Sequence, residues 1–170
     1  MVNVLAQHDL LPDCLEIEVT ESAVMSNAGQ ALAVLEALDA AGVRLAIDDF
    51  GTGYSSLSYL QRLPAKVVKI DKSFMNQIAV DAGKRSLVSA MTSLSHDLGY
   101  RVVAEGIEDQ SALDAVQRAG CDEAQGYFFG RPMLPDHFVE WHRNWDPDAS
   151  RPSPVLLLKA SQALVGVPPG

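Results

Sequence analysis

Apolar residues follow two different spacings along most of the chain, and the two spacings alternate. In three segments they recur every three or four residues, which is the spacing of one helix face. These segments are 31–38, 87–98 and 113–116, and they are followed by Gly42, Gly99 and Gly120. Glycine is common where a helix ends in a left-handed conformation. The pattern therefore predicts three helices that end at these glycines.

Short runs rich in β-formers lie between the predicted helices. They are 15–19, 43–47, 66–70, 102–103 and a less regular 122–124. Strands that alternate with helices are typical of a parallel sheet covered by helices. We therefore predict an α/β fold.

The end of the chain differs from the rest. Phe138, Trp141 and Trp145 predict a last helix that packs on the sheet domain. Residues 146–170 hold five of the nine prolines and no amphipathic helical pattern. We expect one domain over residues 1–145, followed by a Pro-rich, mobile tail over 146–170.

Charge and composition exclude several classes of protein. Thirteen basic and 22 acidic residues give a net charge of −9, which argues against polymeric nucleic acid or an anionic membrane as a partner. Cys14 and Cys121 are far apart and form no Cys-x-x-Cys pair, so neither a disulfide scaffold nor a zinc knuckle is expected. The sequence shows no secretory signal and no apolar run long enough to span a membrane. We expect a cytoplasmic protein.

Charged side chains gather where the predicted strands end. The pairs are Glu18 and Glu21, Asp48 and Asp49, Lys69 and Asp71, and Glu105 and Glu108. Because parallel strands point the same way, we expect these side chains at one rim of the sheet, where active sites form. Carboxylates packed together repel one another, and oxygen ligands suit Mg²⁺ or Mn²⁺. For any single acid, a role as a helix N-cap stays open.

A glycine-containing loop, Phe50-Gly-Thr-Gly-Tyr-Ser-Ser-Leu57, follows the double aspartate. Its two glycines allow a tight turn, and Ser55 or Ser56 can cap a following helix. The loop is either a simple strand-to-helix turn or a mobile flap that senses metal or substrate. It is not a Walker loop, because no Gly-Lys-Ser/Thr ends it.

Taken together, these segments resemble the EAL-domain family of cyclic di-GMP phosphodiesterases. The matching stretches are 15–22, 47–57, 68–74, 103–108 and 125–133. The second and the fifth are distinctive as strings, namely Ile47-Asp-Asp-Phe-Gly-Thr-Gly-Tyr-Ser-Ser-Leu57 and Gln125-Gly-Tyr-Phe-Phe-Gly-Arg-Pro-Met133. The resemblance covers about residues 1–143. It implies a TIM-like (β/α) barrel that hydrolyses one phosphodiester bond of cyclic di-GMP to give a linear dinucleotide.

The resemblance also implies roles for the charged residues. Glu18, Asp48 and Glu105 would be metal ligands, and Asp49 would bind a second metal ion. Lys69 would orient the attacking water or stabilise the developing charge. Mg²⁺ or Mn²⁺ would be the cofactor, and two such ions suit the in-line displacement of a phosphodiester.

Further residues would support this site. By the same resemblance, Glu21 would hold the loop that contains Thr52 and Gly53, Gln125 would position water or substrate, and Asp71 and Glu108 would support the metal ligands. Cyclic di-GMP is the expected ligand. A second copy of the chain, in a homodimer, is the other expected partner.

The chain departs from the family pattern near its beginning. It shows no Glu-Ala-Leu motif on an early strand and no asparagine ligand on a later one, so we expect that it begins after both. About six of the eight barrel strands would then be present, which leaves two unpaired edges and an exposed flank of the core.

Three functions are consistent with this departure. The chain is a fragment of an active phosphodiesterase, or a catalytically incompetent remnant that binds nucleotide or a partner protein. A third hypothesis from outside the family is a metal-dependent lyase or aldolase in which Lys69 forms a Schiff base.

Overall fold

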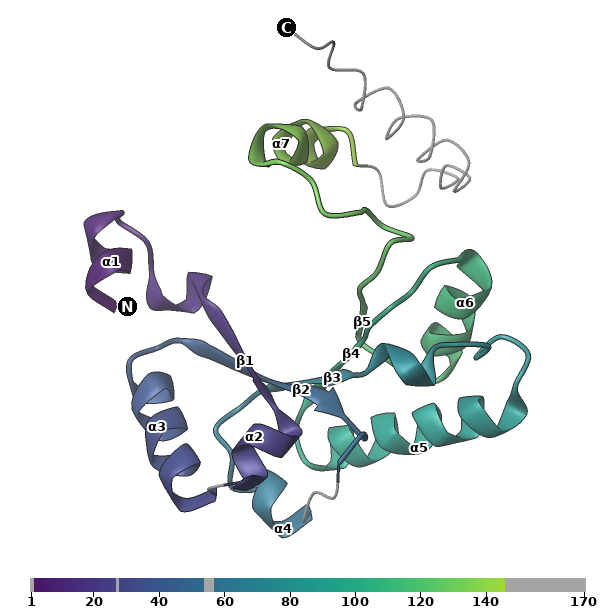
Figure 1. Cartoon of the computed structure of the whole chain (residues 1–170), viewed down its shortest axis with the longest axis horizontal. Coiled ribbons are helices and arrows are strands. Elements are labelled where there is room, and N and C mark those ends of the chain that lie inside the picture. Colours follow the sequence, from purple (N-terminus) through teal and green to yellow (C-terminus); the bar gives the residue numbers. More distant parts are fainter. Residues whose placement is uncertain (1, 27, 54–56, 146–170) are drawn as a thin grey trace, which may run out of the picture.

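The computed structural model describes residues 2–26, 28–53 and 57–145. Its centre is a parallel sheet of five strands in the order β1-β2-β3-β4-β5 (Figure 1). The strands are β1 Glu16–Thr20, β2 Arg44–Phe50, β3 Val67–Ile70, β4 Arg101–Ala104 and β5 Glu123–Ala124. This confirms the predicted α/β fold and its incomplete barrel. The described residues hold five strands, where about six of the eight barrel strands were expected, and the five strands coincide with the five β-rich runs of the sequence.

Helices alternate with these strands along the chain. They are α1 Val2–Gln7, α2 Glu21–Ser26, α3 Ala28–Ala40, α4 Leu57–Leu60, α5 Ala82–Asp97, α6 Gln110–Arg118 and α7 Pro135–Arg143, with short 3-10 turns at Pro12–Cys14 (η1) and Lys72–Phe74 (η2). The three predicted helices are α3, α5 and α6, and the glycines after them have φ values of +84°, +85° and +87°. Within the described residues, no helix is long and apolar enough to cross a membrane. The predicted tail, 146–170, lies outside the described residues.

One face of the sheet carries the hydrophobic core. Successive residues of a strand point to opposite faces, and the set that faces the helices is apolar. Its members include Leu45, Ile47, Val68, Ile70 and Val102, each at most 2% exposed. They pack with Val88 and Met91 of α5 and with Leu113 and Val116 of α6. In Figure 1, helices α2 to α5 lie below the sheet and form this layer.

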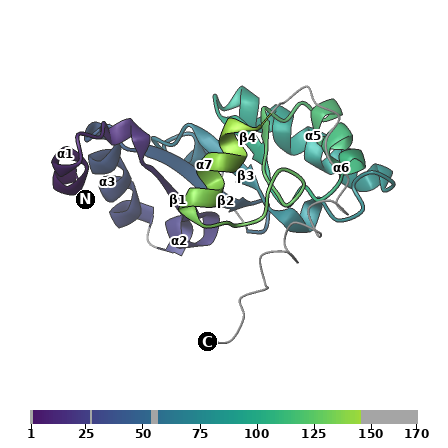
Figure 2. The ribbon, with the colours of Figure 1, turned by 90° about the horizontal axis from the view of Figure 1, so that it is seen from above.

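The opposite face of the sheet has no such helix layer. Its side chains are mostly charged, namely Glu16, Glu18, Arg44, Lys69, Arg101 and Glu123, interspersed with Ala46, Val67 and Val103. Parallel sheets are usually covered on both faces because both are apolar. The expected exposed flank of the core is therefore largely polar, and water can solvate it. Helix α7 lies across from this face, and Figure 2 shows it above β1 to β3.

Candidate functional site

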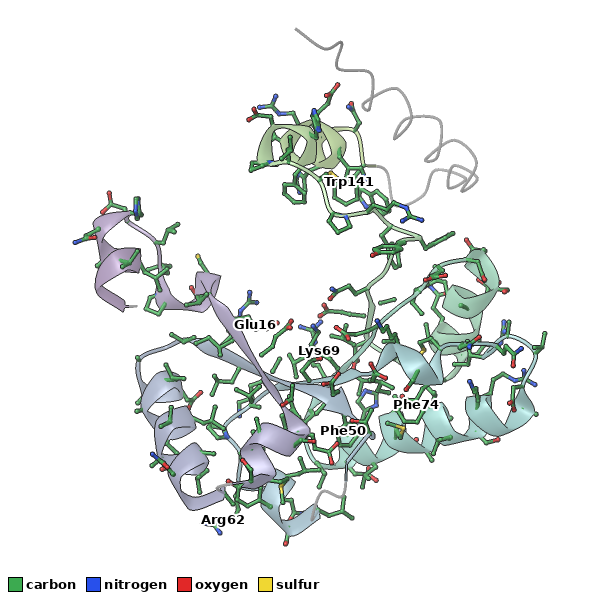
Figure 3. All side chains as sticks on the ribbon, in the orientation of Figure 1. Glu16, Phe50, Arg62, Lys69, Phe74 and Trp141 are labelled. Carbon is green, nitrogen blue, oxygen red and sulfur yellow. The ribbon has the colours of Figure 1, made fainter. Side chains whose placement is uncertain are left out.

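A buried lysine lies at the centre of the polar face. Lys69 of β3 is 4% exposed. Its Nζ contacts Oε1 of Glu18 on β1 and lies 2.6 Å from Oε1 of Glu105, the residue after β4. Figure 3 shows Lys69 above the sheet, on the side away from the helix layer. Three different strands thus bring one cation and two carboxylates together.

The sheet register explains how Lys69 reaches a strand that is not its neighbour. Strand β2 lies between β1 and β3, and its Ala46 pairs with Glu18 on one side and with Val67 on the other. Ala46 is fully buried, and its methyl group leaves room for the long lysine stem to cross β2. On the other side, the N–H of Glu105 donates to the carbonyl of Ile70 at 3.1 Å, which fixes the backbone at the end of β4.

The two carboxylates keep Lys69 charged. Burial by itself lowers the pKa of Lys69, but the hydrogen bonds with Glu105 and Glu18 and the attraction of their charges raise it, and the pKa ends above its usual value. A Schiff-base lysine has to be a neutral amine in order to attack a carbonyl. The environment of Lys69 therefore opposes the lyase or aldolase hypothesis.

The double aspartate lies at an irregular end of β2. The register between β2 and β3 shifts between Ile47 and Phe50, and Asp49 has a φ of 55°. The carbonyl of Asp49 accepts hydrogen bonds from the N–H and the hydroxyl of Thr52, at 3.2 and 2.8 Å. Oδ1 of Asp48 is buried and has no hydrogen-bond partner within the described residues. A buried carboxylate oxygen without a partner costs free energy, and a bound cation would remove that cost.

The acids do not form a ready-made metal cage. Within residues 2–26, 28–53 and 57–145, no three Asp, Glu, His or Cys side chains lie close enough together to hold a metal ion. Instead, the Lys69 ammonium joins Glu18 and Glu105. In chemistry, the oxygen donors and the unpaired Asp48 Oδ1 fit a hard divalent ion. The metal-ligand roles of Glu18, Asp48, Asp49 and Glu105 therefore stay predictions.

Glu21 lies against the loop after β2. It begins α2 and is only 3% exposed. Its Oε2 accepts a hydrogen bond from the N–H of Gly51 at 3.0 Å. A Cβ atom placed on Gly53 would lie 2.8 Å from its Oε1, so a larger residue at this position would require the Glu21 carboxylate to shift. The loop residues 54–56 lie outside the described part, so the choice between turn and flap stays open.

The remaining predicted site residues are placed differently. Asp71 accepts a hydrogen bond from the N–H of Ser73 at 3.0 Å and caps η2. The hydrogen bonds with Ser73 lower the pKa of Asp71. Glu108 is exposed. In the described part of the chain, no hydrogen bond or ion pair joins Asp71 or Glu108 to Lys69. Gln125 follows β5, and its N–H donates to the carbonyl of Ala104 at 2.8 Å.

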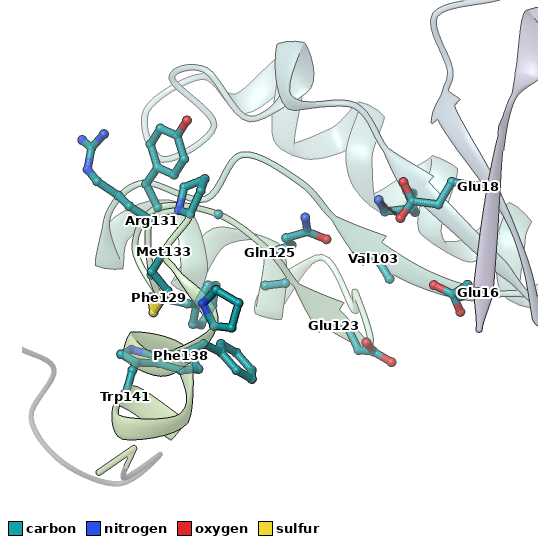
Figure 4. Close-up of a pocket in the computed structure, with 17 residues that line it drawn as sticks. Glu16, Glu18, Val103, Glu123, Gln125, Phe129, Arg131, Met133, Phe138 and Trp141 are labelled. Atoms are coloured by element: carbon teal, nitrogen blue, oxygen red, sulfur yellow. Dashed lines mark hydrogen bonds and ion pairs between the residues drawn. The ribbon is translucent and has the colours of Figure 1, made fainter. Parts of the chain in front are cut away.

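A cleft of about 800 Å³ opens directly above Lys69. Figure 4 shows Glu18, Val103 and Gln125 on its sheet side. The residues that face them come from the segment after β5 and from α7, namely Phe129, Arg131, Met133, Phe138 and Trp141. The Arg131 guanidinium lies 4.5 Å from the ring centre of Tyr127.

Phe138, Trp141 and Trp145 were expected to pack on the sheet domain. Trp145, which follows α7, does so, because its ring centre lies 6.3 Å from that of Phe129, a residue packed against the core. Helix α7 itself does not enter the core, and for its aromatic residues the prediction was wrong. None of the α7 residues is buried, and the Phe138 side chain is 49% exposed. The sheet face opposite α7 is mostly charged, so it offers few apolar partners, and the aromatic side chains line the cleft instead.

Comparison with known proteins decides the family. The family model described as the EAL domain matches residues 1–132. The chain belongs to the EAL domain family. This agrees with the motifs at the ends of the strands and with the α/β sheet.

Individual EAL proteins resemble this chain closely. The bifunctional diguanylate cyclase/cyclic di-GMP phosphodiesterase MucR of Pseudomonas aeruginosa is 48% identical over 131 residues, which cover 77% of this chain and 19% of MucR. The solved MucR phosphodiesterase in complex with cyclic di-GMP has a TM-score of 0.76 and 46% identity, covering 80% of this chain and 55% of that one. BlrP1 of Klebsiella pneumoniae, solved with manganese and cyclic di-GMP, has a TM-score of 0.73 and 40% identity, covering 78% and 34%. The chain thus spans about a fifth of the length of MucR.

The chain contains one Glu-Ala-Leu tripeptide, the motif after which the family is named, but this tripeptide does not lie on a strand. Glu36-Ala37-Leu38 lies within α3, not on a strand. Glu36 is exposed, and Leu38 packs against the hydrophobic core. The string is therefore part of a helix that packs on the core, and its glutamate lies on the exposed side.

Ala46 also shapes the site, and it was not predicted to do so. It is a small residue in the strand run 43–47, at a position that alternates with large buried ones. Only the sheet register shows that it lies between Glu18 of β1 and Val67 of β3, two residues before Lys69.

Proposed function

We propose that this chain contributes to the hydrolysis of one phosphodiester bond of cyclic di-GMP, with Mg²⁺ or Mn²⁺ as cofactor. The observation that carries the proposal is the buried Lys69 between Glu18 and Glu105 at the floor of an open cleft. The family supports the substrate, because MucR is a cyclic di-GMP phosphodiesterase and its solved structure holds this nucleotide.

The acidic residues of this chain would bind the metal ions. Glu18, Asp48 and Glu105 would hold a divalent ion, and Asp49 would hold a second one. Their oxygens are the hard donors such ions prefer, and the unpaired Asp48 Oδ1 supports this role. When bound, two such ions supply a Lewis acid that activates water and neutralises phosphoryl oxygens.

Lys69 supplies positive charge in the same place, where the phosphodiester becomes more negative during hydrolysis. The lysine is buried and lines the cleft. Gln125 lines the cleft and offers an amide that can orient water or a phosphate oxygen. Glu21 would keep the loop with Thr52 and Gly53 in place through its hydrogen bond with Gly51.

A nucleotide-binding role without catalysis is the second candidate. It is favoured by one observation, because in the described residues no three acids lie close enough to hold an ion. Binding of cyclic di-GMP then needs only the cleft and the cation of Lys69.

We also place this activity in the cytoplasm. Cys14 and Cys121 are both free thiols, which agrees with a reducing compartment. A homodimer stays a prediction, and light scattering of the purified chain measures it.

Turnover tests the proposal directly. The purified chain is incubated with cyclic di-GMP and Mn²⁺, and the linear dinucleotide is quantified by liquid chromatography. We expect product that disappears in Glu105→Ala and persists in Asp97→Asn, a change at an exposed acid at the end of α5. Binding without product would favour the second candidate, and neither binding nor product would contradict both.

A further inference from the structure

The ion pairs of Lys69 occupy the atoms that a metal would need. Its ammonium contacts Oε1 of Glu18 and lies 2.6 Å from Oε1 of Glu105. Both are predicted metal ligands. A carboxylate oxygen that accepts a short hydrogen bond from an ammonium group is a poor donor to a second cation at the same point.

Lys69 is more deeply buried than the two carboxylates that it contacts. The side chain of Lys69 is 6% exposed, whereas those of Glu18 and Glu105 are 44% and 20% exposed. Both carboxylates are therefore more accessible to solvent than the ammonium. Glu18 and Lys69 line the cleft, so an ion that arrives through it meets Glu18 with Lys69 already paired to it.

Asp48 shows that the lysine does not satisfy the whole group of acids. Its Oδ1 is buried and unpaired within the described residues, although β2 lies between the strands of Glu18 and Lys69. The ammonium thus pairs with two acids, and among the described residues Asp48 takes part in no ion pair. A divalent ion carries more charge and accepts more oxygen ligands than an ammonium group, so it can replace the lysine between Glu18 and Glu105.

We propose that Lys69 is a built-in competitor for the divalent-ion site, which has to leave Glu18 and Glu105 before an ion binds there. This rests on the proposed function, because it concerns the same site. Four rotatable bonds in the lysine stem let the ammonium move while it stays charged. The cleft above Lys69 gives it a place to go, and there it can meet an anionic phosphodiester. Metal binding therefore comes before the lysine becomes available to the substrate.

Mn²⁺ affinity without nucleotide tests this order. Isothermal titration calorimetry compares the wild-type chain with Lys69→Met, Lys69→Arg and Lys66→Met, the last being an exposed lysine just before the same strand. We expect Lys69→Met to bind Mn²⁺ about 10-fold more tightly, or better, because removing the ammonium frees both carboxylates and takes away a positive charge that repels the ion. Lys69→Arg keeps the competing charge and should bind no more tightly than wild type. Lys66→Met should match wild type.

The outcomes separate the two claims. If wild type binds Mn²⁺ and Lys69→Met binds equally or more weakly, the competition is refuted and the metal site stands. If neither chain binds Mn²⁺, the metal site itself is refuted, and with it the proposed hydrolysis.

A second measurement covers the case in which Lys69→Met does not fold. Reductive methylation of the wild-type chain, read by mass spectrometry, should modify Lys69 faster with Mg²⁺ than without it, while Lys66 reacts at one rate. Equal rates at Lys69 in both conditions would overturn the proposal.

Discussion

Gly53→Ala is the substitution whose cost the structure defines most sharply. The new Cβ would lie 2.8 Å from Oε1 and 3.1 Å from Cδ of Glu21. Glu21 has little room to retreat, because it is 3% exposed and its Oε2 accepts the hydrogen bond from Gly51 N–H at 3.0 Å. Gly53 is not among the glycines with positive φ, so the contact and not the backbone conformation sets the cost.

The expected loss in the free energy of unfolding depends on whether the Glu21 side chain moves. If Glu21 moves, the hydrogen bond to a charged group is lost, which costs about 1.5–3 kcal/mol. If it stays, overpacking costs about 1–3 kcal/mol. We therefore expect the free energy of unfolding to fall by about 2 kcal/mol, or the Tm to fall by about 4–8 °C in a chain of this size. Urea unfolding followed by circular dichroism measures it.

Two controls make the test specific. Gly29→Ala adds a methyl group within α3, where nothing lies within 4 Å of it, so it should be neutral or stabilising by up to about 1 kcal/mol. In the Glu21→Ala background, Gly53→Ala should cost less than about 0.5 kcal/mol, because the clashing atoms are gone. An equal cost in both backgrounds would refute the contact with Glu21 as its cause.

Three further substitutions test other parts of the fold. Asp109→Ala removes the side chain that caps α6 and should cost about 1 kcal/mol in urea unfolding at pH 7. Hydrogen bonds with Ser111 and with the first turn of α6 lower the pKa of Asp109. Its contribution to the free energy of unfolding is therefore complete above the unfolded-state pKa of about 4, and it is lost as the pH falls through the lower folded-state pKa. Asp109→Asn should keep the cap and lose that pH dependence. Tyr100→Phe removes a buried hydroxyl that donates to the last carbonyl of α4 at 2.5 Å, and thermal unfolding should show a loss of about 1–2 kcal/mol. Gly126→Ala would press a methyl group into the backbone of Ile107, and because backbone cannot retreat we expect a loss of about 3 kcal/mol in the same assay. A loss below about 0.5 kcal/mol would contradict the packing of the segment after β5 against Ile107.

The sequence was informative about elements that have strong local signals. The helix over 87–98 combined an apolar stripe with a glycine stop, and it is found as α5, Ala82–Asp97. Strand ends were less readable. The run 43–47 continues to Phe50 in the structure, because Asp48 still pairs with Thr20 of β1 and Phe50 pairs with Ile70 of β3 after a register shift that local pattern does not reveal.

For the site, too, local sequence signals predicted some features, while others depended on the sheet register. The strand-end position of Glu18, Lys69 and Glu105 followed from the parallel topology, and all three meet. The pairing itself was not predictable, because it depends on Lys69 reaching across β2 over Ala46, and that requires the register. The position of α7 above the sheet was likewise out of reach, since it depends on how polar the facing sheet surface is.

The proposed function requires that charged residues from separate strands form one site for cyclic di-GMP and a divalent ion. Calorimetry of cyclic di-GMP binding, with and without Mn²⁺, measures whether they do. We expect binding that requires Mn²⁺, is lost in Glu105→Gln and is unchanged in Asp97→Asn. Absence of binding to the wild-type chain, or binding that neither Mn²⁺ nor Glu105→Gln alters, would contradict it.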